Sequence, residues 1–304
     1  MCCLFGLHNY SGSLSRKQKE KILSVLSAAC EERGTDATGI AYHSAGRLSV
    51  YKRPWPAHLM RFRITGDTRV IMGHTRMATQ GDERKNRNNH PFAGRAGATA
   101  FALAHNGVLR NDTFLRKKWN LPKTRIETDS YVAVQLLERR KELSFRSLRH
   151  MAEQLEGSFT FTVLSEKNEL YFIKGDNPMC IFHYPERGLY LYASTESILK
   201  KALKQLPYYL GKPARVNLYS GEILCIDAQG ICSRSQFDDT SLLHTPWLPW
   251  TYDEPVRTKE DYLEELKSVA AYYGLPPEDV DELLGSGFST DDIEEMLYCR
   301  CTSR

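Results

Sequence analysis

The sequence has no apolar run that approaches the ~18–20 residues of a membrane-spanning helix. Its first residues do not show the basic stretch followed by an apolar stretch that marks a secretory signal. No glycine-rich loop has the spacing of a phosphate-binding site. The cysteine pairs Cys225/Cys232 and Cys299/Cys301 lack the C-x2-C spacing of zinc ligands. These absences predict a cytoplasmic protein that uses no membrane, no metal and no cofactor.

The composition is that of a globular protein, with 41% hydrophobic and 26% charged residues. Eight cysteines without an export signal indicate reduced thiols and not a disulfide framework. Residues 253–304 hold 14 Asp/Glu and 5 Lys/Arg, which leaves 23 and 36 in residues 1–252. The net charge is therefore −9 in the tail and +13 in the body. Either the basic body binds an anionic partner or the acidic tail folds back onto it. Nucleic acid is not an expected partner.

Hydrophobic periodicity predicts strands alternating with a few helices. Strands are predicted at 1–10, 39–43, 48–52, 70–74, 101–105, 157–163, 170–174, 179–184, 189–193, 222–227 and 231–235, and helices at 15–33, 128–140, 145–155 and 196–206. The fifth strand is expected to break at the turn dipeptide Asn106-Gly107, and Thr128 to cap the second helix. Two antiparallel sheet regions with helices outside them indicate a layered α+β fold.

The chain divides by composition into three parts. Residues 1–236 hold the strand-rich domain. Residues 237–258 hold prolines and tryptophans without periodicity and are predicted to be a linker. Residues 259–304 are predicted to form a small acidic tail of three helices, at 259–273, 277–284 and 290–298, which is too small for a second catalytic domain.

The first six residues, Met1-Cys2-Cys3-Leu4-Phe5-Gly6, place a thiol next to the start of the chain. If Met1 is removed, Cys2 carries both a thiol and a free α-amino group. A cysteine thiol has an ordinary pKa near ~8.5 and needs a base, and an α-amino group titrates near ~7.7–8.0. Cys2 could therefore hold nucleophile and base in one residue. The alternative is a short apolar strand that contains two cysteines.

Four polar motifs follow in order, and their spacing gives Cys2 a context. They are Gly-His-Thr-Arg-Met-Ala-Thr-Gln-Gly at 73–81, Asn-His-Pro-Phe at 89–92, His-Asn-Gly-Val at 105–108 and Thr-Asp-Ser at 128–130. With Cys2 they resemble the glutamine-hydrolysing domain of the class II glutamine amidotransferases, which are N-terminal-nucleophile hydrolases. The resemblance runs to about Gln236, roughly three quarters of the chain. It implies an αββα sandwich, in which two antiparallel sheets lie between helix layers.

The resemblance implies a catalytic role for three residues. Cys2 attacks the side-chain amide of glutamine, which gives a thioester and ammonia. The side-chain amide of Asn106 and the backbone N–H of Gly107 stabilise the oxyanion of the tetrahedral intermediate. The alternative for Asn106-Gly107 is a β-turn that needs a residue tolerating positive φ.

Four further residues match the family's substrate site. Arg76 corresponds to the residue that clamps the α-carboxylate, a task suited to a two-pronged donor. Asp129 corresponds to the acceptor of the α-ammonium, and Thr79 and His90 are expected to line the pocket. The alternatives are a surface salt bridge for Arg76 and a charge at a helix N-terminus for Asp129.

Neighbouring residues are expected to support the site and not to react. His74 and His105 lie at strand ends and are predicted to pack or to form hydrogen bonds. Cys3 points away from Cys2 in a regular strand and is predicted to enter the core. Residues 33–39 resemble the family's stretch between first helix and second strand, and we expect them to pack near Cys2.

Two departures from the family are visible. Met77 stands where many members have tryptophan, so closure over glutamine is expected to differ. No segment after Gln236 is long enough for the synthase that usually accepts the ammonia. The leading hypothesis is therefore a free-standing glutaminase subunit that passes ammonia to a separate synthase. The alternatives are another N-terminal-nucleophile amide hydrolase, or a catalytically idle domain that binds a ligand or scaffolds a complex.

Overall fold

The computed structural model describes residues 2–242 and, in the C-terminal part, residues 263, 266–267, 270–271, 275–290, 292–293 and 296–297. Contacts divide the chain into two compact units, Met1–Thr245 and Pro246–Arg304, which are treated separately below. The division falls inside the predicted linker. Phe237 and Leu242, at the start of that linker, are buried in the hydrophobic core of the first unit.

The first unit contains two antiparallel sheets. The seven-stranded sheet has the order β11-β9-β10-β1-β4-β2-β3. Its strands are β1 (Cys3–Asn9), β2 (Ala37–Ser44), β3 (Arg47–Arg53), β4 (Val70–Arg76), β9 (Cys180–Tyr184), β10 (Leu189–Ala193) and β11 (Ala214–Val216). β1 pairs with β4 on one side and with β10 on the other, so the strand that follows Cys2 lies inside the sheet.

The six-stranded sheet has the order β13-β12-β8-β7-β6-β5. Its strands are β5 (Phe92–Ala96), β6 (Thr99–Leu109), β7 (Gly157–Ser165), β8 (Leu170–Lys174), β12 (Glu222–Ile226) and β13 (Cys232–Gln236). β6 is the longest of them and pairs with β7 from Phe101 to Leu109, whereas its pairing with β5 ends at Leu103. The last six residues of β6 therefore have a strand neighbour on one edge only.

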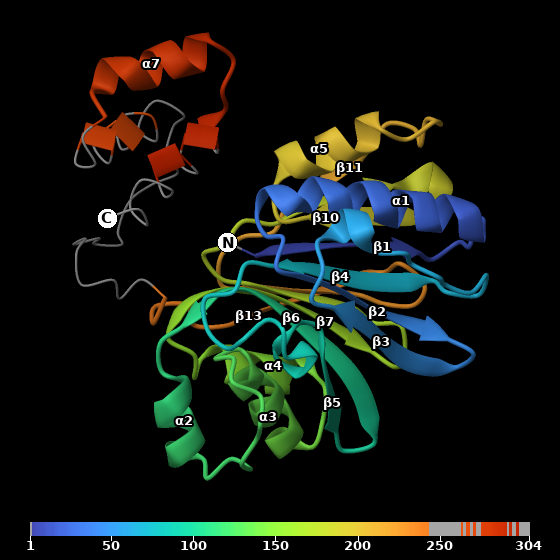
Figure 1. Cartoon of the computed structure of the whole chain (residues 1–304), viewed down its shortest axis with the longest axis vertical. Coiled ribbons are helices and arrows are strands. Elements are labelled where there is room, and N and C mark those ends of the chain that lie inside the picture. The colour runs from blue at the N-terminus through green and yellow to red at the C-terminus, as the bar shows by residue number, and fades with distance from the viewer. Residues whose placement is uncertain are drawn as a thin grey trace. The chain divides into compact units, whose positions relative to one another are not determined.

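The two sheets lie face to face with helices on both outer sides (Figure 1). α1 (Arg16–Ala29) and α5 (Glu196–Lys204) cover the seven-stranded sheet, and α3 (Tyr131–Arg140) and α4 (Phe145–Ala152) cover the six-stranded sheet. α2 (Asp112–Lys118) and the 3-10 turns η1 (Cys30–Glu32), η2 (Ala57–Leu59), η3 (Asn86–Asn88) and η4 (Pro185–Arg187) complete the unit. The predicted αββα sandwich is confirmed.

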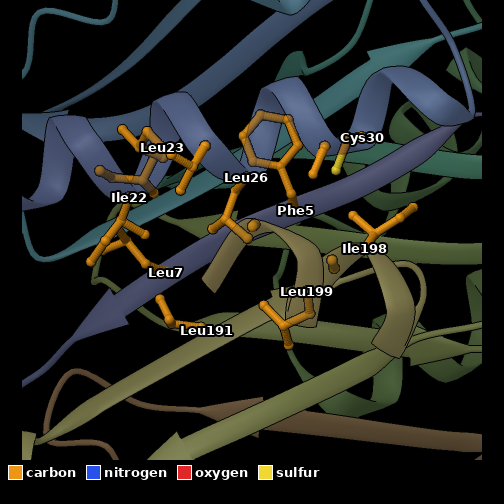
Figure 2. Packing of buried hydrophobic residues seen from close by; sticks show 14 of the residues in the cluster. Phe5, Leu7, Ile22, Leu23, Leu26, Cys30, Leu191, Ile198 and Leu199 are labelled. Carbon is orange, nitrogen blue, oxygen red and sulfur yellow. The ribbon is translucent and has the colours of Figure 1, made fainter. Parts of the chain in front are cut away.

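The side chains of β1 alternate between the two faces of its sheet, so this strand contributes to the core on both sides. Phe5 and Leu7 face α1, where they pack against Ile22, Leu23 and Leu26 (Figure 2). Leu4 points the other way, into the cluster between the sheets. Because side chains alternate along a strand, an apolar run buried on both faces needs a layer on each side.

Cys3 is fully buried in the same outer cluster, which confirms its predicted place in the core. Its Sγ lies 3.0 Å from the Sγ of Cys30. The thiol next in sequence to Cys2 is thus held on the opposite face of β1.

Two local predictions were wrong. The chain does not turn at Asn106-Gly107, because β6 continues through both residues to Leu109. Gly107 has a positive φ of 141°, which favours glycine, and the pairing of β6 with β7 continues through it. Thr128 does not cap α3: its hydroxyl has no hydrogen bond within the described residues, and the helix begins at Tyr131. The remaining strand and helix predictions up to residue 236 agree with the structure within a few residues, but β5, β11 and α2 were missed.

The described part of the second unit contains α7 (Pro277–Gly285), as predicted. Leu266, Ala270, Val280, Ile293 and Leu297 form its small apolar cluster. Ser289 and Asp292 bond reciprocally, since each side chain accepts from the other's backbone N–H. The third helix is therefore capped at Ser289. Most of the predicted linker, with Cys299 and Cys301, lies outside the described residues. Among the described helices none has the length and apolarity to cross a membrane.

Candidate active site

A small recess, open at its mouth, lies where β1, β4 and β6 meet the segment before α3. Its lining comes from segments far apart in sequence: Cys2, Arg76, Met77, Thr79, Gln80, His90, His105, Gly107, Thr128, Asp129 and Ser130. Six of the seven predicted site residues are in this lining. The seventh, Asn106, is 1% exposed and lies beside Gly107 on β6.

Cys2 lies just before β1 at the edge of the recess, and its Sγ is 3.5 Å from the carbonyl oxygen of Met77. Burial raises the pKa of the Cys2 thiol, and the nearby Arg76 charge opposes that rise. A thiol in this setting stays largely protonated at neutral pH and needs a base to react.

Residues 33–39 lie beside Cys2, as predicted. The Nε of Arg33 donates to the carbonyl oxygen of Cys2 at 3.1 Å. The backbone N–H of Asp36 donates to the carbonyl oxygen of Arg76 at 2.9 Å, and its carboxylate accepts from the backbone N–H of Ala78 at 2.7 Å. One turn thus holds both the thiol-bearing residue and the end of β4.

One side of the recess, here termed the buried wall, consists of residues 105–109 of β6 and residues 128–130. The side-chain amide of Asn106 is buried, and neither its oxygen nor its nitrogen has a hydrogen-bond partner among the described residues. A Cβ at Gly107 would lie 2.0 Å from the carbonyl oxygen of Ser158. Only glycine therefore fits at position 107.

The backbone of the buried wall also presents a donor to the recess. Backbone N–H groups alternate between the two edges of a strand. The N–H of Leu109 points away from β7 and donates to the Oδ2 of Asp129 at 2.6 Å. By alternation, the N–H of Gly107 faces the same edge, which β5 leaves uncovered beyond Leu103.

Asp129 is 4% exposed and faces β6 instead of the start of α3. Besides the bond from Leu109, its Oδ1 accepts from the hydroxyl of Ser130 at 3.2 Å. The Ser130 Oγ lies 2.8 Å from the Nδ1 of His105. Its bonds therefore go to the backbone of β6 and to the hydroxyl of Ser130, the N-cap residue of α3, and none goes to a backbone N–H of the described part of that helix.

The opposite side, here termed the loop wall, consists of residues 76–89. Arg76 is 2% exposed, so it is not a surface salt bridge. Its Nη1 donates to the Oδ1 of Asn89 at 2.7 Å, and its Nη2 donates to the carbonyl oxygens of Gln80 and Gly81. Both terminal nitrogens of the guanidinium are therefore held in place by acceptors in the loop that follows Arg76.

The two walls are connected through Glu127, which precedes the buried wall. Its carboxylate accepts from Lys85 at 2.8 Å and from the Nδ2 of Asn88 at 3.0 Å. The backbone N–H of Glu127 donates to the Oδ1 of Asn88 at 3.0 Å. Lys85 is the main cause of a pKa of about 2 for Glu127, and Asn88 is the next cause. This connection lies at the surface, since the side chains of Lys85 and Glu127 are 42% and 39% exposed.

Three buried histidines lie behind the recess. The Nε2 of His74 is 2.9 Å from the carbonyl oxygen of His105, which joins β4 to β6. The rings of His74 and His90 have centroids 4.4 Å apart. Burial lowers the pKa of His74 to about 3 and lowers the pKa of His90 and of His105 as well. All three are therefore neutral near pH 7, and the predicted packing and hydrogen-bonding roles of His74 and His105 are confirmed.

Sequence reasoning missed five lining residues: Met77, Gln80, His105, Thr128 and Ser130. Each of them stands one or two residues from a predicted site residue. Membership in the same motifs could have indicated them. The contact between Ser130 and His105 spans 25 residues and had no local signal.

Comparison with known protein families and structures gives concordant results. Residues 74–201 match a family model described as a glutamine amidotransferase domain. The chain is 30% identical over 178 residues to the glutamine–fructose-6-phosphate aminotransferase (isomerizing) of Bacillus cereus, over 56% of this chain and 29% of that protein. It is 28% identical over 176 residues to the 7-cyano-7-deazaguanine synthase of Saccharolobus solfataricus, over 55% of this chain and 37% of that protein. The chain thus spans about a third of the length of these relatives.

Two solved structures share the fold. One is the glutamine phosphoribosylpyrophosphate amidotransferase from B. subtilis complexed with ADP and GMP, with a TM-score of 0.60 and 20% identity. The other is described as the allosteric regulatory enzyme of purine biosynthesis, with a TM-score of 0.62 and 20% identity. Each match covers 78% of this chain and 49% of the other. At this identity the likeness shows the architecture alone.

Proposed function

We propose that the glutamine amidotransferase domain of this chain is of class II, the N-terminal-nucleophile type, and that it hydrolyses glutamine through a thioester on Cys2. The observation that carries the proposal is the convergence of Cys2, Arg76, Gly107 and Asp129 on one recess. These residues come from four separate segments. Because they line the same recess, all four can contact the same substrate molecule.

The reaction begins after removal of Met1, which exposes the α-amino group of Cys2. That amine takes the thiol proton, directly or through one water, as the sulfur bonds to the side-chain carbonyl carbon of glutamine. The C–N bond then breaks, and the nitrogen leaves as ammonia with the proton returned by the amine. Water cleaves the thioester, which releases glutamate and restores the thiol.

The intermediate carries its negative charge on the former carbonyl oxygen. The unpartnered Asn106 amide and the outward-facing N–H of Gly107 supply two donors next to the recess. Donors already oriented toward such an oxygen stabilise the transition state by about 3–4 kcal/mol each. A buried amide without a partner costs stability, and a catalytic role accounts for keeping it.

The two charged groups on the α-carbon of glutamine fit the two walls. The loop wall presents Arg76 for the α-carboxylate, and the buried wall presents Asp129 for the α-ammonium. Thr79 and His90 line the space between them. Because His90 is neutral, it contributes shape and dipole to the pocket and no charge.

We assign the ammonia to an acceptor enzyme on another chain. The similar proteins carry names of two different chemistries, an aminotransferase acting on fructose-6-phosphate and a deazaguanine synthase. Similarity to these proteins therefore does not identify the enzyme that accepts the ammonia. Affinity capture of the full chain under native conditions, followed by an ammonia-dependent assay of each captured synthase, identifies it; capture of no ammonia-using enzyme contradicts this assignment.

The proposed function is tested at Cys2. Intact-mass analysis should show loss of Met1, and a glutamine analogue with an electrophilic side-chain carbonyl should add one equivalent to Cys2. Cys2→Ala should abolish glutamate formation, whereas Cys232→Ala, an exposed thiol on β13, should keep it. Hydrolysis by Cys2→Ala at the wild-type rate would exclude the mechanism.

A further inference from the structure

The carboxylate of Asp129 is fastened to β6 at two points. Its Oδ2 accepts directly from the backbone N–H of Leu109 at 2.6 Å. Its Oδ1 accepts from Ser130 at 3.2 Å, and Ser130 Oγ in turn lies 2.8 Å from His105 Nδ1. Neither oxygen accepts from a backbone N–H of α3, although Ser130 is the N-cap residue of that helix.

The two fastening points flank Gly107 symmetrically in sequence. His105 lies two residues before Gly107 and Leu109 lies two residues after it. Asp129 is therefore attached to the stretch of backbone that presents the Gly107 N–H. The proposed ammonium acceptor and the proposed oxyanion donors belong to one piece of structure.

That piece is rigid for physical reasons. His105, Ser130 and Asp129 are 1%, 2% and 4% exposed, so water does not compete for their hydrogen bonds. The ring of His105 stacks on Phe161 of β7 with centroids 4.5 Å apart, and its Nδ1–H donates to the Ser130 hydroxyl, which donates to Asp129. Moving the carboxylate requires breaking these buried contacts.

We propose that the His105–Ser130–Asp129 relay is a molecular ruler that selects amide substrates by length. The proposal rests on the proposed function, because it takes Asp129 as the ammonium site and β6 as the oxyanion site. A fixed separation between them accommodates one chain length between α-carbon and amide. Glutamine has two methylenes there and asparagine has one, a difference of one C–C bond of about 1.5 Å.

Position errors of this size matter in catalysis, since a misplacement of about 1 Å can cost about 10²-fold in rate. Binding of one methylene in an apolar pocket discriminates by a similar factor of about 10–200-fold, and the fixed separation adds to it. His105 and Ser130 thus act as positioning residues that determine specificity through Asp129. They are not required to touch the reacting amide.

The test compares glutamine with asparagine by kcat/KM. Ser130→Ala removes the hydroxyl that joins His105 to Asp129. It should lower the glutamine-to-asparagine ratio of kcat/KM about tenfold, through loss on glutamine. Ser130→Thr retains the hydroxyl and should restore most of the ratio, whereas Ser130→Val, of the same shape without the hydroxyl, should not. A fully buried serine outside the recess, Ser27, serves as the control, and Ser27→Ala should leave the ratio unchanged.

The possible outcomes distinguish failure of the ruler proposal from failure of the proposed glutamine hydrolysis. A structural defect lowers both substrates equally because it removes active enzyme, so an unchanged ratio in Ser130→Ala and Ser130→Val overturns the ruler. Wild-type enzyme that hydrolyses neither amide overturns the proposed function and the ruler with it. If Ser130→Ala does not fold, the ratio difference between Ser130→Thr and Ser130→Val decides.

Discussion

The two walls of the recess both contain buried hydrogen bonds, such as that from Arg76 to Asn89 in the loop wall, but they differ in how much of each wall lies at the surface. In the buried wall, His105, Ser130 and Asp129 bond to one another with almost no exposure to water. In the loop wall, Thr79 and Gln80 are exposed, and the loop is tied to its surroundings by Lys85 and Glu127 at the surface. Buried hydrogen bonds do not compete with water and fix geometry, whereas exposed ion pairs are screened and worth little.

This difference assigns the walls different tasks. Under the proposed function, the buried wall holds groups whose position must not vary during the reaction, which is what preorganised donors require. The loop wall carries Arg76 and can adjust at small cost, which suits substrate entry and release. Substitutions in the buried wall should therefore change kcat, and substitutions in the loop wall should change KM.

The largest effect is expected from Asn106→Ala in the buried wall. Loss of one oxyanion donor should lower kcat about 10²–10³-fold with little change in KM. Thermal stability should be kept, because the Asn106 amide has no hydrogen bond to lose within the described residues. Steady-state kinetics and a melting curve measure both. A fall in stability with unchanged kcat would assign Asn106 to structure alone.

The matched substitution in the loop wall is Asn89→Ala. Asn89 is fully buried and accepts from Arg76 Nη1 at 2.7 Å, so its loss leaves the guanidinium held through Nη2 alone and less well oriented toward the α-carboxylate. Hydrogen bonds to charged groups contribute about 1.5–3 kcal/mol, and the expected result is a rise in KM of at least about tenfold with kcat kept. An equal fall in kcat for Asn89→Ala and Asn106→Ala would remove the distinction between the walls.

A smaller effect on stability is expected at Lys52 on β3, whose ammonium donates to the carbonyl oxygens of Asn89 and Pro91. Burial is the main cause that lowers the pKa of Lys52 to about 8, and the Arg76 charge adds to it. The unfolded chain therefore binds the proton more tightly than the folded one between about pH 8 and the ordinary lysine pKa of ~10.4. Stability rises with pH where the unfolded state holds more protons.

Lys52→Met removes this titration. The free energy of unfolding of the wild type, measured by denaturant titration, should rise relative to the variant as pH increases from about 8 to about 10. Other groups titrate in both proteins, so the difference between them isolates Lys52. A difference that is flat with pH, or that falls, would contradict the assignment.

Sequence patterns predicted the layered fold because each strand carries its own alternation and each sheet face its own apolar residues. The same patterns failed at Asn106-Gly107, where a dipeptide typical of turns continues a strand. The difference lies in φ of Gly107, which is set by the approach of Ser158 and not by neighbours in sequence. Thr128 failed as a cap for a similar reason, since the segment before α3 turns its side chains toward β6.

Motif order predicted most of the site, because residues that match a family pattern can be assigned one by one. Arg76, Gly107 and Asp129 reach the recess with Cys2, although no local pattern in their strands distinguishes them from core positions. What the motifs could not supply was the attachment of Asp129 to β6 or of Arg76 to Asn89. Those contacts depend on tertiary distances between segments.

The smallest effect is expected from Glu127→Gln, which weakens the surface link between the walls. Lys85 and Arg87 lie 2.8 Å and 3.5 Å from its carboxylate. Since exposed ion pairs contribute little, KM for glutamine should rise only about two- to threefold. The rise should be present near 0.01 M salt, where the Debye length is ~30 Å, and should vanish near 1 M, where it is ~3 Å.

Lowering the pH over the range in which the enzyme is assayed should not reproduce the effect of Glu127→Gln on KM. The folded pKa of Glu127 is lowered to about 2, so its contribution is present above the unfolded carboxyl pKa near 4.5 and is lost only as pH falls through about 2. KM measured at two salt concentrations for wild type, Glu127→Gln and the distant control Glu186→Gln tests the link. If the effect of Glu127→Gln survives high salt, the loop wall is not held by screened charges, and the contrast with the buried wall loses its physical basis.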